Sequence, residues 1–412
     1  MNLSKNLNIN FLNNNKSIYL FLLLISLISR IITSFFFGDR VLENEWAILV
    51  SNLYNFKTLS MLNFDGLLIP NLWMPPFYAY FIYLHTLIFG MEENLANYVI
   101  ATQVIISSFT TIIFYKIISR FFNFRTSILG AILFSLFPLI VFSACQISSA
   151  SLYLFFLLTF ILLILNLSSN DSANSIKNLL LIGFLSGILI LTRRDFILIY
   201  FFSLFYSILF FRVSLKRIVL VLIITSITIS PYVIRNYLVF DKFIVHSGFG
   251  YNLWKAYNPN AKVEGYYMQS DELKSEINKV KKDIFYRINE DKIYLNEAKK
   301  FIIENPEKSF SLFSKRLFSF YFIDFDSSQK NYYNYFHTIP NLLVSILSLI
   351  GFFIFYKKDS KFNYLICLFL IILTVYSLFA LLPRYKIYIL PFQIILSLNL
   401  IEFLSKKLSK NY

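Results

Sequence analysis

The feature that most constrains this chain is a series of ten apolar runs, each close to the length that crosses a lipid bilayer. Of its 412 residues, 57% are hydrophobic and 19% aromatic. Water-soluble domains of this size cannot hide so much apolar surface, so most of the chain needs lipid as its solvent. The sequence therefore predicts an all-α polytopic membrane protein with about ten transmembrane helices. The runs cover residues 17–37, 95–119, 127–144, 148–167, 178–192, 196–211, 218–234, 340–356, 362–382 and 387–404.

The basic residues gather in alternate loops between these runs. If the N-terminus is cytoplasmic, the cytoplasmic loops hold Arg120 and Arg125, the cluster at 212–217, and Lys406 and Lys407. This pattern follows the positive-inside rule. Membrane topology thus already explains the net charge of +15, and we expect no nucleic-acid partner. The pattern predicts a multi-pass plasma (inner) membrane protein with both termini cytoplasmic.

The run at 75–90 has to be placed outside the membrane for this topology to hold. It opens with two prolines and is short for a span, which suits a juxtamembrane or re-entrant helix. We then expect three parts, listed by residue range. They are an N-terminal transmembrane module (1–234) with a first external loop (38–94), an external segment (235–339), and C-terminal transmembrane helices (340–412).

The external segment is polar enough to form helices in water. We expect helices at 271–282 and 291–304, and a restart at Asn305, with Pro306 at the first helical position. In the restarted helix Phe310, Phe313, Leu317 and Phe320 fall along one side, and Lys315 and Arg316 point toward another. Such a helix is suited to lie on a membrane surface.

Two carboxylates lie just beyond the first apolar run, at Glu43 and Glu45. A carboxylate at an apolar boundary has a raised pKa unless a cation compensates, which favours a role as general base. The alternative is an ordinary helix start, because acidic residues suit the first turn of the helix that residues 46–56 suggest.

An aromatic corner with two prolines follows, from Trp73 through Pro75 and Pro76 to Tyr78. The residue before each proline is held extended, so the corner is rigid. It is also typical of an interfacial aromatic belt, in which Trp and Tyr lie at the headgroups without a catalytic role.

Four arginines lie at helix ends on the expected external face: Arg193, Arg194, Arg235 and Arg384. A guanidinium group binds phosphate well because its planar fork makes paired charge-assisted hydrogen bonds. The alternatives for the first two are an ion pair with Asp195 or simple snorkelling.

No Walker loop, dinucleotide fingerprint or Cys/His metal cluster is present in the sequence, which argues against soluble nucleotide chemistry.

Taken in order, these motifs resemble the membrane glycosyltransferases of the GT-C fold. The resemblance is to family 39 and its relatives, which include protein mannosyltransferases and the aminoarabinose transferases. Residues 231–240, Pro-Tyr-Val-Ile-Arg-Asn-Tyr-Leu-Val-Phe, are the most specific match, and residues 383–386 resemble the C-terminal element. From this likeness we expect a substrate cavity lined by Trp46, Trp73, Pro75, Pro76, Tyr78, Asn236 and Tyr237.

The resemblance implies an inverting transfer of a hexosyl or pentosyl sugar. The donor would be a polyprenyl-phosphate sugar, and the acceptor a lipid, polysaccharide or protein on the external side. Glu43 or Glu45 would be the base, and the four arginines would bind the donor phosphate. Many relatives carry an acidic residue in the second external loop that helps to bind a divalent metal, but residues 146–152 contain no carboxylate here. We therefore assign no metal ligand and no certain cofactor.

Two other functions compete with this interpretation. A flippase or transporter for lipid-linked saccharides needs polar residues along a path through the membrane. The runs are almost purely apolar apart from Arg30, which we expect to face protein or a cavity. An O-antigen-type polymerase would centre on arginine-rich external loops, not on an acidic motif after the first span.

Overall fold

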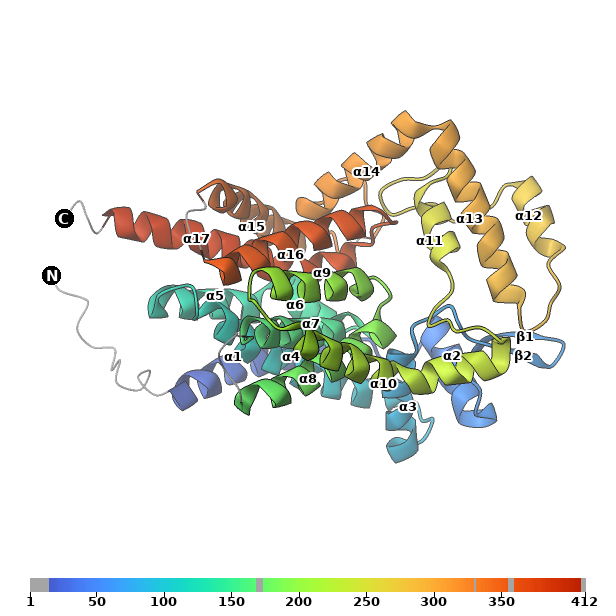
Figure 1. Cartoon of the computed structure of the whole chain (residues 1–412), viewed down its shortest axis with the longest axis horizontal. Helices are drawn as coiled ribbons and strands as arrows, with labels where there is room; N and C mark the ends of the chain where they lie inside the picture. The colour runs from blue at the N-terminus through green and yellow to red at the C-terminus, as the bar shows by residue number, and fades with distance from the viewer. Residues whose placement is uncertain (1–14, 168–172, 330, 355–358, 409–412) are drawn as a thin grey trace.

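The computed structural model describes residues 15–167, 173–329, 331–354 and 359–408. Each apolar run becomes helical over most of its length, although the end of the run at 355–356 lies outside the described residues. The helices of this bundle are α1 (Asn15–Phe37), α4 (Leu95–Ile118), α5 (Phe124–Leu136), α6 (Pro138–Ala144), α7 (Ala150–Leu165), α8 (Ala173–Thr192), α9 (Phe196–Leu209), α10 (Leu215–Phe240), α15 (Tyr335–Phe353), α16 (Ser360–Ser377) and α17 (Leu390–Leu408). The start of α1 and the end of α17 lie at the same end of the bundle (Figure 1).

Not every bundle helix is both long and apolar enough to cross a membrane by itself. Within the described residues five are: α1, α4, α10, α15 and α16. The predicted helix at 127–144 is instead broken into α5 and α6, which meet at 50°. The break falls at Pro138, because proline lacks an N–H and its ring clashes with the preceding turn. The prediction of an all-α polytopic bundle is confirmed. Among the described helices, five are long and apolar enough to span a membrane, or six spans result if α5 and α6 together form one.

Two glycines bring α8 and α10 close together. Gly183 and Gly187 are four residues apart and so share one face of α8. A Cβ atom at Gly187 would lie 2.5 Å from the side chain of Thr228. Small residues at this spacing let membrane helices approach closely. Arg193 directly follows α8, and Arg235 lies near the C-terminal end of α10, so this packing helps to position both arginines.

The one charge predicted inside an apolar run, Arg30, faces the bundle interior. Its guanidinium donates to Ser107 Oγ at 2.8 Å, to Ser26 Oγ at 2.6 Å and to the Ser135 carbonyl at 3.0 Å. These acceptors come from α1, α4 and α5, so the buried arginine joins three helices. The expectation for Arg30 is confirmed.

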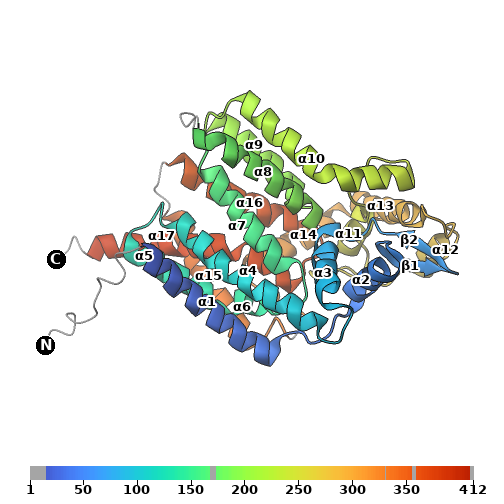
Figure 2. The same cartoon turned by 90° about the horizontal axis from the view of Figure 1, so that it is seen from below.

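The segments that the sequence analysis assigns to the external side, here called the external segments, gather at the end of the bundle opposite the start of α1 and the end of α17 (Figures 1 and 2). The first loop forms α2 (Asn44–Phe56), strands β1 (Ser60–Phe64) and β2 (Leu67–Pro70), and α3 (Pro76–Phe89). The later elements are α11 (Phe249–Ala256), α12 (Asp271–Asn278), α13 (Tyr286–Glu304), α14 (Pro306–Tyr321) and the 3₁₀ helix η2 (Pro383–Tyr388). The sequence analysis missed the antiparallel β1–β2 hairpin, whose turn holds Asp65 and Gly66 at positive φ.

Helix α3 has 14 residues and is not among the candidate spans. In both views it runs across the direction of the bundle helices (Figures 1 and 2). This arrangement is the one expected for the run at 75–90. Two of the expected part boundaries fall inside helices, because α10 continues past residue 234 to Phe240 and α15 begins at Tyr335.

The helix restart at Pro306 is confirmed, and the burial of Arg316 adds to the expected picture of that helix. Arg316 is fully buried, and Phe320 is 1% exposed, whereas Phe310 is 70% exposed. The helix therefore packs inward through the side that carries Arg316, whose guanidinium donates to the Ala256 carbonyl. A hydrogen bond to a helix end made this inward orientation possible for a charged residue.

Candidate active site

Helix α2 presents the two predicted carboxylates differently. Glu43 is exposed at the N-cap position, and Glu45 is half-buried in the first turn. Burial lowers the pKa of Lys255, while the nearby Tyr385 and Glu45 act in the opposite direction. Glu45 has the smallest of these effects, and among the described residues it forms no ion pair with Lys255, a residue that sequence analysis did not single out.

A third carboxylate, Asp39, joins the first two external loops. Its Oδ2 accepts a hydrogen bond from the Ile147 N–H at 2.7 Å, and its own N–H donates to the Cys145 carbonyl at 3.1 Å. Burial raises the pKa of Asp39, the Ile147 hydrogen bond lowers it, and Glu43 raises it. The second external loop thus meets Asp39 with a main-chain amide and not with a carboxylate.

The described residues offer no metal centre at this place. Among them no three His, Cys, Asp or Glu side chains are grouped so as to hold a metal ion. The Asp39 carboxylate accepts a hydrogen bond from the Ile147 N–H of the next loop. We derive no step through a metal.

Arg193 lies in a cage of tyrosine rings at the end of α8. Its Nε donates to Asp195 Oδ1 at 3.0 Å, and its NH1 donates to the Tyr388 hydroxyl at 3.2 Å. Burial lowers the pKa of Arg193, but Asp195 and the tyrosines raise it well above its ordinary value. The guanidinium carbon lies 4.6–5.6 Å from the ring centres of Tyr153, Tyr376, Tyr385 and Tyr388.

Three cations surround the Tyr385 phenol, and we call Arg193, Lys255 and Arg384 the Tyr385 cation cluster. Burial alone would raise the pKa of this phenol, but the three cations lower that pKa below its ordinary value. Arg193 is paired with Asp195. Lys255 and Arg384 are half-buried, and neither forms an ion pair or donates a hydrogen bond among the described residues. The cluster is therefore a region of positive potential with two unpaired charges.

Arg194 connects two external segments. Its guanidinium donates to the Ser247 carbonyl at 2.6 Å and to the Trp73 carbonyl at 2.9 Å. The Trp73 ring in turn lies 4.7 Å from the ring of Tyr251 and 4.7 Å from the guanidinium of Arg287. Arg194 and Trp73 thus hold the first external loop against the later segment.

Arg235 lies at a separate place, on an apolar groove of about 230 Å³. Its NH1 donates to the Asn236 Oδ1 at 2.8 Å and to the Asn71 carbonyl at 3.3 Å. Arg193, Arg194, Lys255 and Arg384 are not among the residues that line this groove. It is lined by Pro76, Phe77, Tyr80, Leu191, Thr228, Pro231, Tyr232 and Arg235, from α3, α8 and α10.

The residues expected to line the substrate cavity have different surroundings. Pro76 lines the groove directly, just after Pro75. Trp46 packs in the same cluster as two groove residues, Tyr232 and Leu191. Its ring meets that of Tyr78 edge to face, with ring centres 4.7 Å apart.

Tyr78, Asn236 and Tyr237 are not among the residues that line the groove. The Tyr78 hydroxyl donates to Gln103 Oε1 at 2.6 Å. The Asn236 amide donates to the Ile244 carbonyl at 2.7 Å. Tyr237 is 41% exposed and stacks on Phe243. Their present contacts hold the surrounding chain together.

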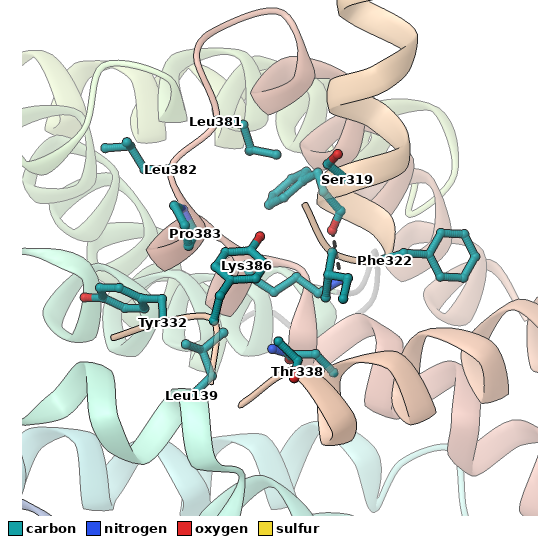
Figure 3. Close-up of a pocket in the computed structure, with 13 residues that line it drawn as sticks. Leu139, Ser319, Phe322, Tyr332, Thr338, Leu381, Leu382, Pro383 and Lys386 are labelled. Carbon is teal, nitrogen blue, oxygen red and sulfur yellow. Dashed lines mark hydrogen bonds between the residues drawn. The ribbon is translucent and has the colours of Figure 1, made fainter. Parts of the chain in front are cut away.

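A buried lysine fixes η2, the element that carries Arg384 and Tyr385. Figure 3 shows the Lys386 side chain among the residues that line a small cavity between α14, α15 and η2. Its Nζ donates to the Phe320 carbonyl at 2.8 Å and also to the Tyr321 carbonyl, at the end of α14. Unpaired carbonyls at a helix C-terminus attract a cation. Lys386 thus caps α14 and anchors η2 to it.

We expect Lys386→Met to destabilise the protein by about 1–3 kcal/mol, because the Phe320 carbonyl loses its buried donor. Thermal unfolding of the purified protein in detergent measures this change. Lys315→Met is the matched control, since Lys315 is exposed on α14. Equal melting temperatures for the two variants would contradict the capping role of Lys386.

Comparisons with known proteins give one family match, which covers residues 74–234 and is described as dolichyl-phosphate-mannose-protein mannosyltransferase. A search of curated proteins finds no match. Among solved structures, the chain is similar to the Archaeoglobus fulgidus oligosaccharyltransferase tethered with an acceptor peptide. That match has a TM-score of 0.57 and 12% identity, and it covers 97% of this chain and 50% of the other.

Two further structures are similar. The Archaeoglobus fulgidus oligosaccharyltransferase AglB in complex with an inhibitory peptide and a dolichol-phosphate matches with a TM-score of 0.53 and 14% identity, over 95% of this chain and 50% of that one. ArnT from Cupriavidus metallidurans bound to undecaprenyl phosphate matches with a TM-score of 0.45 and 11% identity, over 95% and 79%. The chain spans about half the length of the oligosaccharyltransferases that it matches.

Proposed function

We propose, from the premise that this chain has the GT-C fold of membrane glycosyltransferases, that it transfers a sugar from a polyprenyl-phosphate donor to an external acceptor. The observation that carries this proposal is an apolar groove with Arg235 on its wall, whose residues Leu191 and Tyr232 pack in one cluster with Trp46, the neighbour of Glu45. A cation on an apolar wall, with a carboxylate on the adjoining helix, suits the transfer of a group between a lipid carrier and a water-exposed acceptor.

The donor phosphate is best supported at Arg235. A lipid carrier needs an apolar surface for its chain and a cation for its phosphate, and the groove with Arg235 on its wall offers both. The sequence analysis also proposed Arg193 and Arg194 for this role. All three arginines have partners within the protein: Asp195 for Arg193, two main-chain carbonyls for Arg194, and Asn236 Oδ1 with the Asn71 carbonyl for Arg235. Arg235 is preferred because it lines the apolar groove.

Glu45 is the better-supported base of the two candidates. Trp46, its neighbour, packs in one cluster with the groove residues Leu191 and Tyr232, and the Glu45 charge has a small effect on the pKa of Lys255. A base in this position would lie between the donor groove and the cation cluster. Glu43 is exposed and influences Asp39 instead.

The reaction follows from these positions. The acceptor hydroxyl loses its proton to the Glu45 carboxylate as its oxygen forms a bond to the anomeric carbon. The bond from that carbon to the phosphate oxygen breaks, and the polyprenyl phosphate leaves with the electron pair. Attack from the side opposite the phosphate inverts the anomeric centre. Arg235 stabilises the charge that develops on the leaving phosphate.

Analysis of lipid-linked sugars in cells that lack the gene tests the proposed function. We expect one polyprenyl-phosphate sugar to accumulate, because its consumer is missing, and wild-type protein to restore the normal level. An unchanged pool would contradict a donor-consuming enzyme. Accumulation confined to the cytoplasmic leaflet would instead favour a flippase.

A further inference from the structure

We infer that Lys255 and Arg384 form a second anion site, which holds a phosphoryl group of the acceptor while Arg235 holds the donor phosphate. This inference rests on the proposed function, because it names the class of acceptor. The site combines one planar guanidinium fork with one ammonium, a pair well suited to phosphate oxygens.

Main-chain contacts bring these two residues together from distant parts of the sequence. Lys255 lies in the last turn of α11, and Arg384 lies in η2. The Leu381 N–H, just before η2, donates to the Val263 carbonyl at 2.9 Å. At Gly265 a Cβ atom would lie 2.9 Å from the Lys255 carbonyl oxygen and 2.6 Å from Ala380 Cβ. The loop after α11 is thus packed directly on the chain that leads into η2.

Two buried cations stabilise this arrangement. Arg316 of α14 donates to the Ala256 carbonyl at the end of α11, and Lys386 of η2 donates to the carbonyls at the end of α14. These hydrogen bonds link α11 to α14 and α14 to η2. It therefore sets the position of Lys255 relative to Arg384.

The charges of the cluster are not balanced within the described protein. Asp195 pairs with Arg193, whereas among the described residues no carboxylate forms an ion pair with Lys255 or Arg384, and Glu45 has only a small effect on Lys255. The phenol of Tyr385 reports the excess of positive charge, since the cations lower its pKa in spite of burial. A bound phosphoryl group would neutralise this excess.

The cluster and the groove lie on different sides of the end of α8. Leu191 lines the groove with Arg235, whereas Arg193, two residues later, contacts Tyr385 and Tyr388. A polyprenyl-phosphate sugar has one phosphodiester, and Arg235 is the cation on the groove wall. The acceptor hydroxyl must approach the base, Glu45. The charge of Glu45 affects the pKa of Lys255, which belongs to the cluster. The second anion is therefore placed on the acceptor.

Binding measurements separate the two sites without an activity assay. The probes are inorganic phosphate and sugar-free polyprenyl phosphate, with purified protein in detergent at constant ionic strength. We expect the double variant Lys255→Gln, Arg384→Gln to weaken binding of inorganic phosphate about tenfold or more. Its affinity for polyprenyl phosphate should stay within a factor of about two. The exposed Lys262→Gln, on the adjacent loop, is the matched control and should change neither.

Arg235→Gln should give the reverse pattern, with weaker binding of polyprenyl phosphate and unchanged binding of inorganic phosphate. Full binding of inorganic phosphate by the double variant would overturn the second site. Loss of polyprenyl phosphate binding in the double variant would also overturn it, because the cluster would then hold the donor. If wild-type protein binds inorganic phosphate at the cluster but no polyprenyl phosphate, the proposed function fails and the anion site stands.

Discussion

Replacing Glu45 by Gln is expected to lower the rate constant of sugar transfer by about 10²–10⁴-fold, the usual contribution of a general base. Gln keeps the size of the side chain but cannot accept the acceptor proton. The Michaelis constant for the donor should change little, because Arg235 and the apolar groove bind the donor. Transfer from a radiolabelled polyprenyl-phosphate sugar, measured over a range of donor concentrations, separates the two constants.

Glu43→Gln is the matched control for this experiment. Glu43 is two residues away, exposed, and has the same chemistry. We expect its variant to retain transfer within a few-fold of wild type. Full activity of Glu45→Gln together with a large loss in Glu43→Gln would move the base to Glu43. Full activity of both variants and of the double variant would remove this pair from the mechanism.

Replacing Arg235 by Gln is expected to weaken donor binding by about 10- to 150-fold. A hydrogen bond to a charged group contributes about 1.5–3 kcal/mol, and each 1.4 kcal/mol corresponds to about a factor of ten. The apolar groove remains, so a neutral polyprenol should bind the variant as it binds wild type. The measurement is the donor concentration needed for half-maximal transfer.

Lys216→Gln is a suitable control, since Lys216 is exposed at the opposite end of the same helix, α10. It should leave the donor requirement unchanged. An unchanged donor requirement in Arg235→Gln would show that the phosphate binds elsewhere, and the Tyr385 cation cluster would be the next place to look.

The helices were predictable because their signals are local. Apolar runs of spanning length, and the Asn305–Pro306 pair that restarts a helix, act over one or two turns. The break at Pro138 also has a local cause, but the apolar run continues through it, so hydropathy alone predicted one helix. The β1–β2 hairpin was missed because its strands are only five and four residues long.

The candidate site was predictable only in part, because its members meet through tertiary contacts. The sequence indicated Arg193, Arg194, Arg235 and Arg384 as one group of similar helix ends. The structure gives them different partners: a carboxylate, two distant carbonyls, an apolar groove and a tyrosine-rich cluster. No sequence spacing reveals that the Arg194 guanidinium reaches residues 73 and 247.

Lys255 shows most plainly what sequence reasoning lacked. It lies in the eight-residue helix α11, which no apolar run marks, and it carries no motif of its own. Its importance comes from its position near Tyr385, 130 residues later in the chain, and from the lack of a neutralising partner.

Direct observation of the chemical step tests the central claim. Purified protein in lipid vesicles is given a polyprenyl-phosphate sugar of known anomeric configuration and a membrane extract that contains the acceptor, and NMR reports the linkage in the product. The account predicts a glycosidic product of inverted configuration, formed by wild-type protein and about 10²–10⁴-fold more slowly by Glu45→Gln. A product of retained configuration, or movement of the intact donor across the vesicle without transfer, would contradict it.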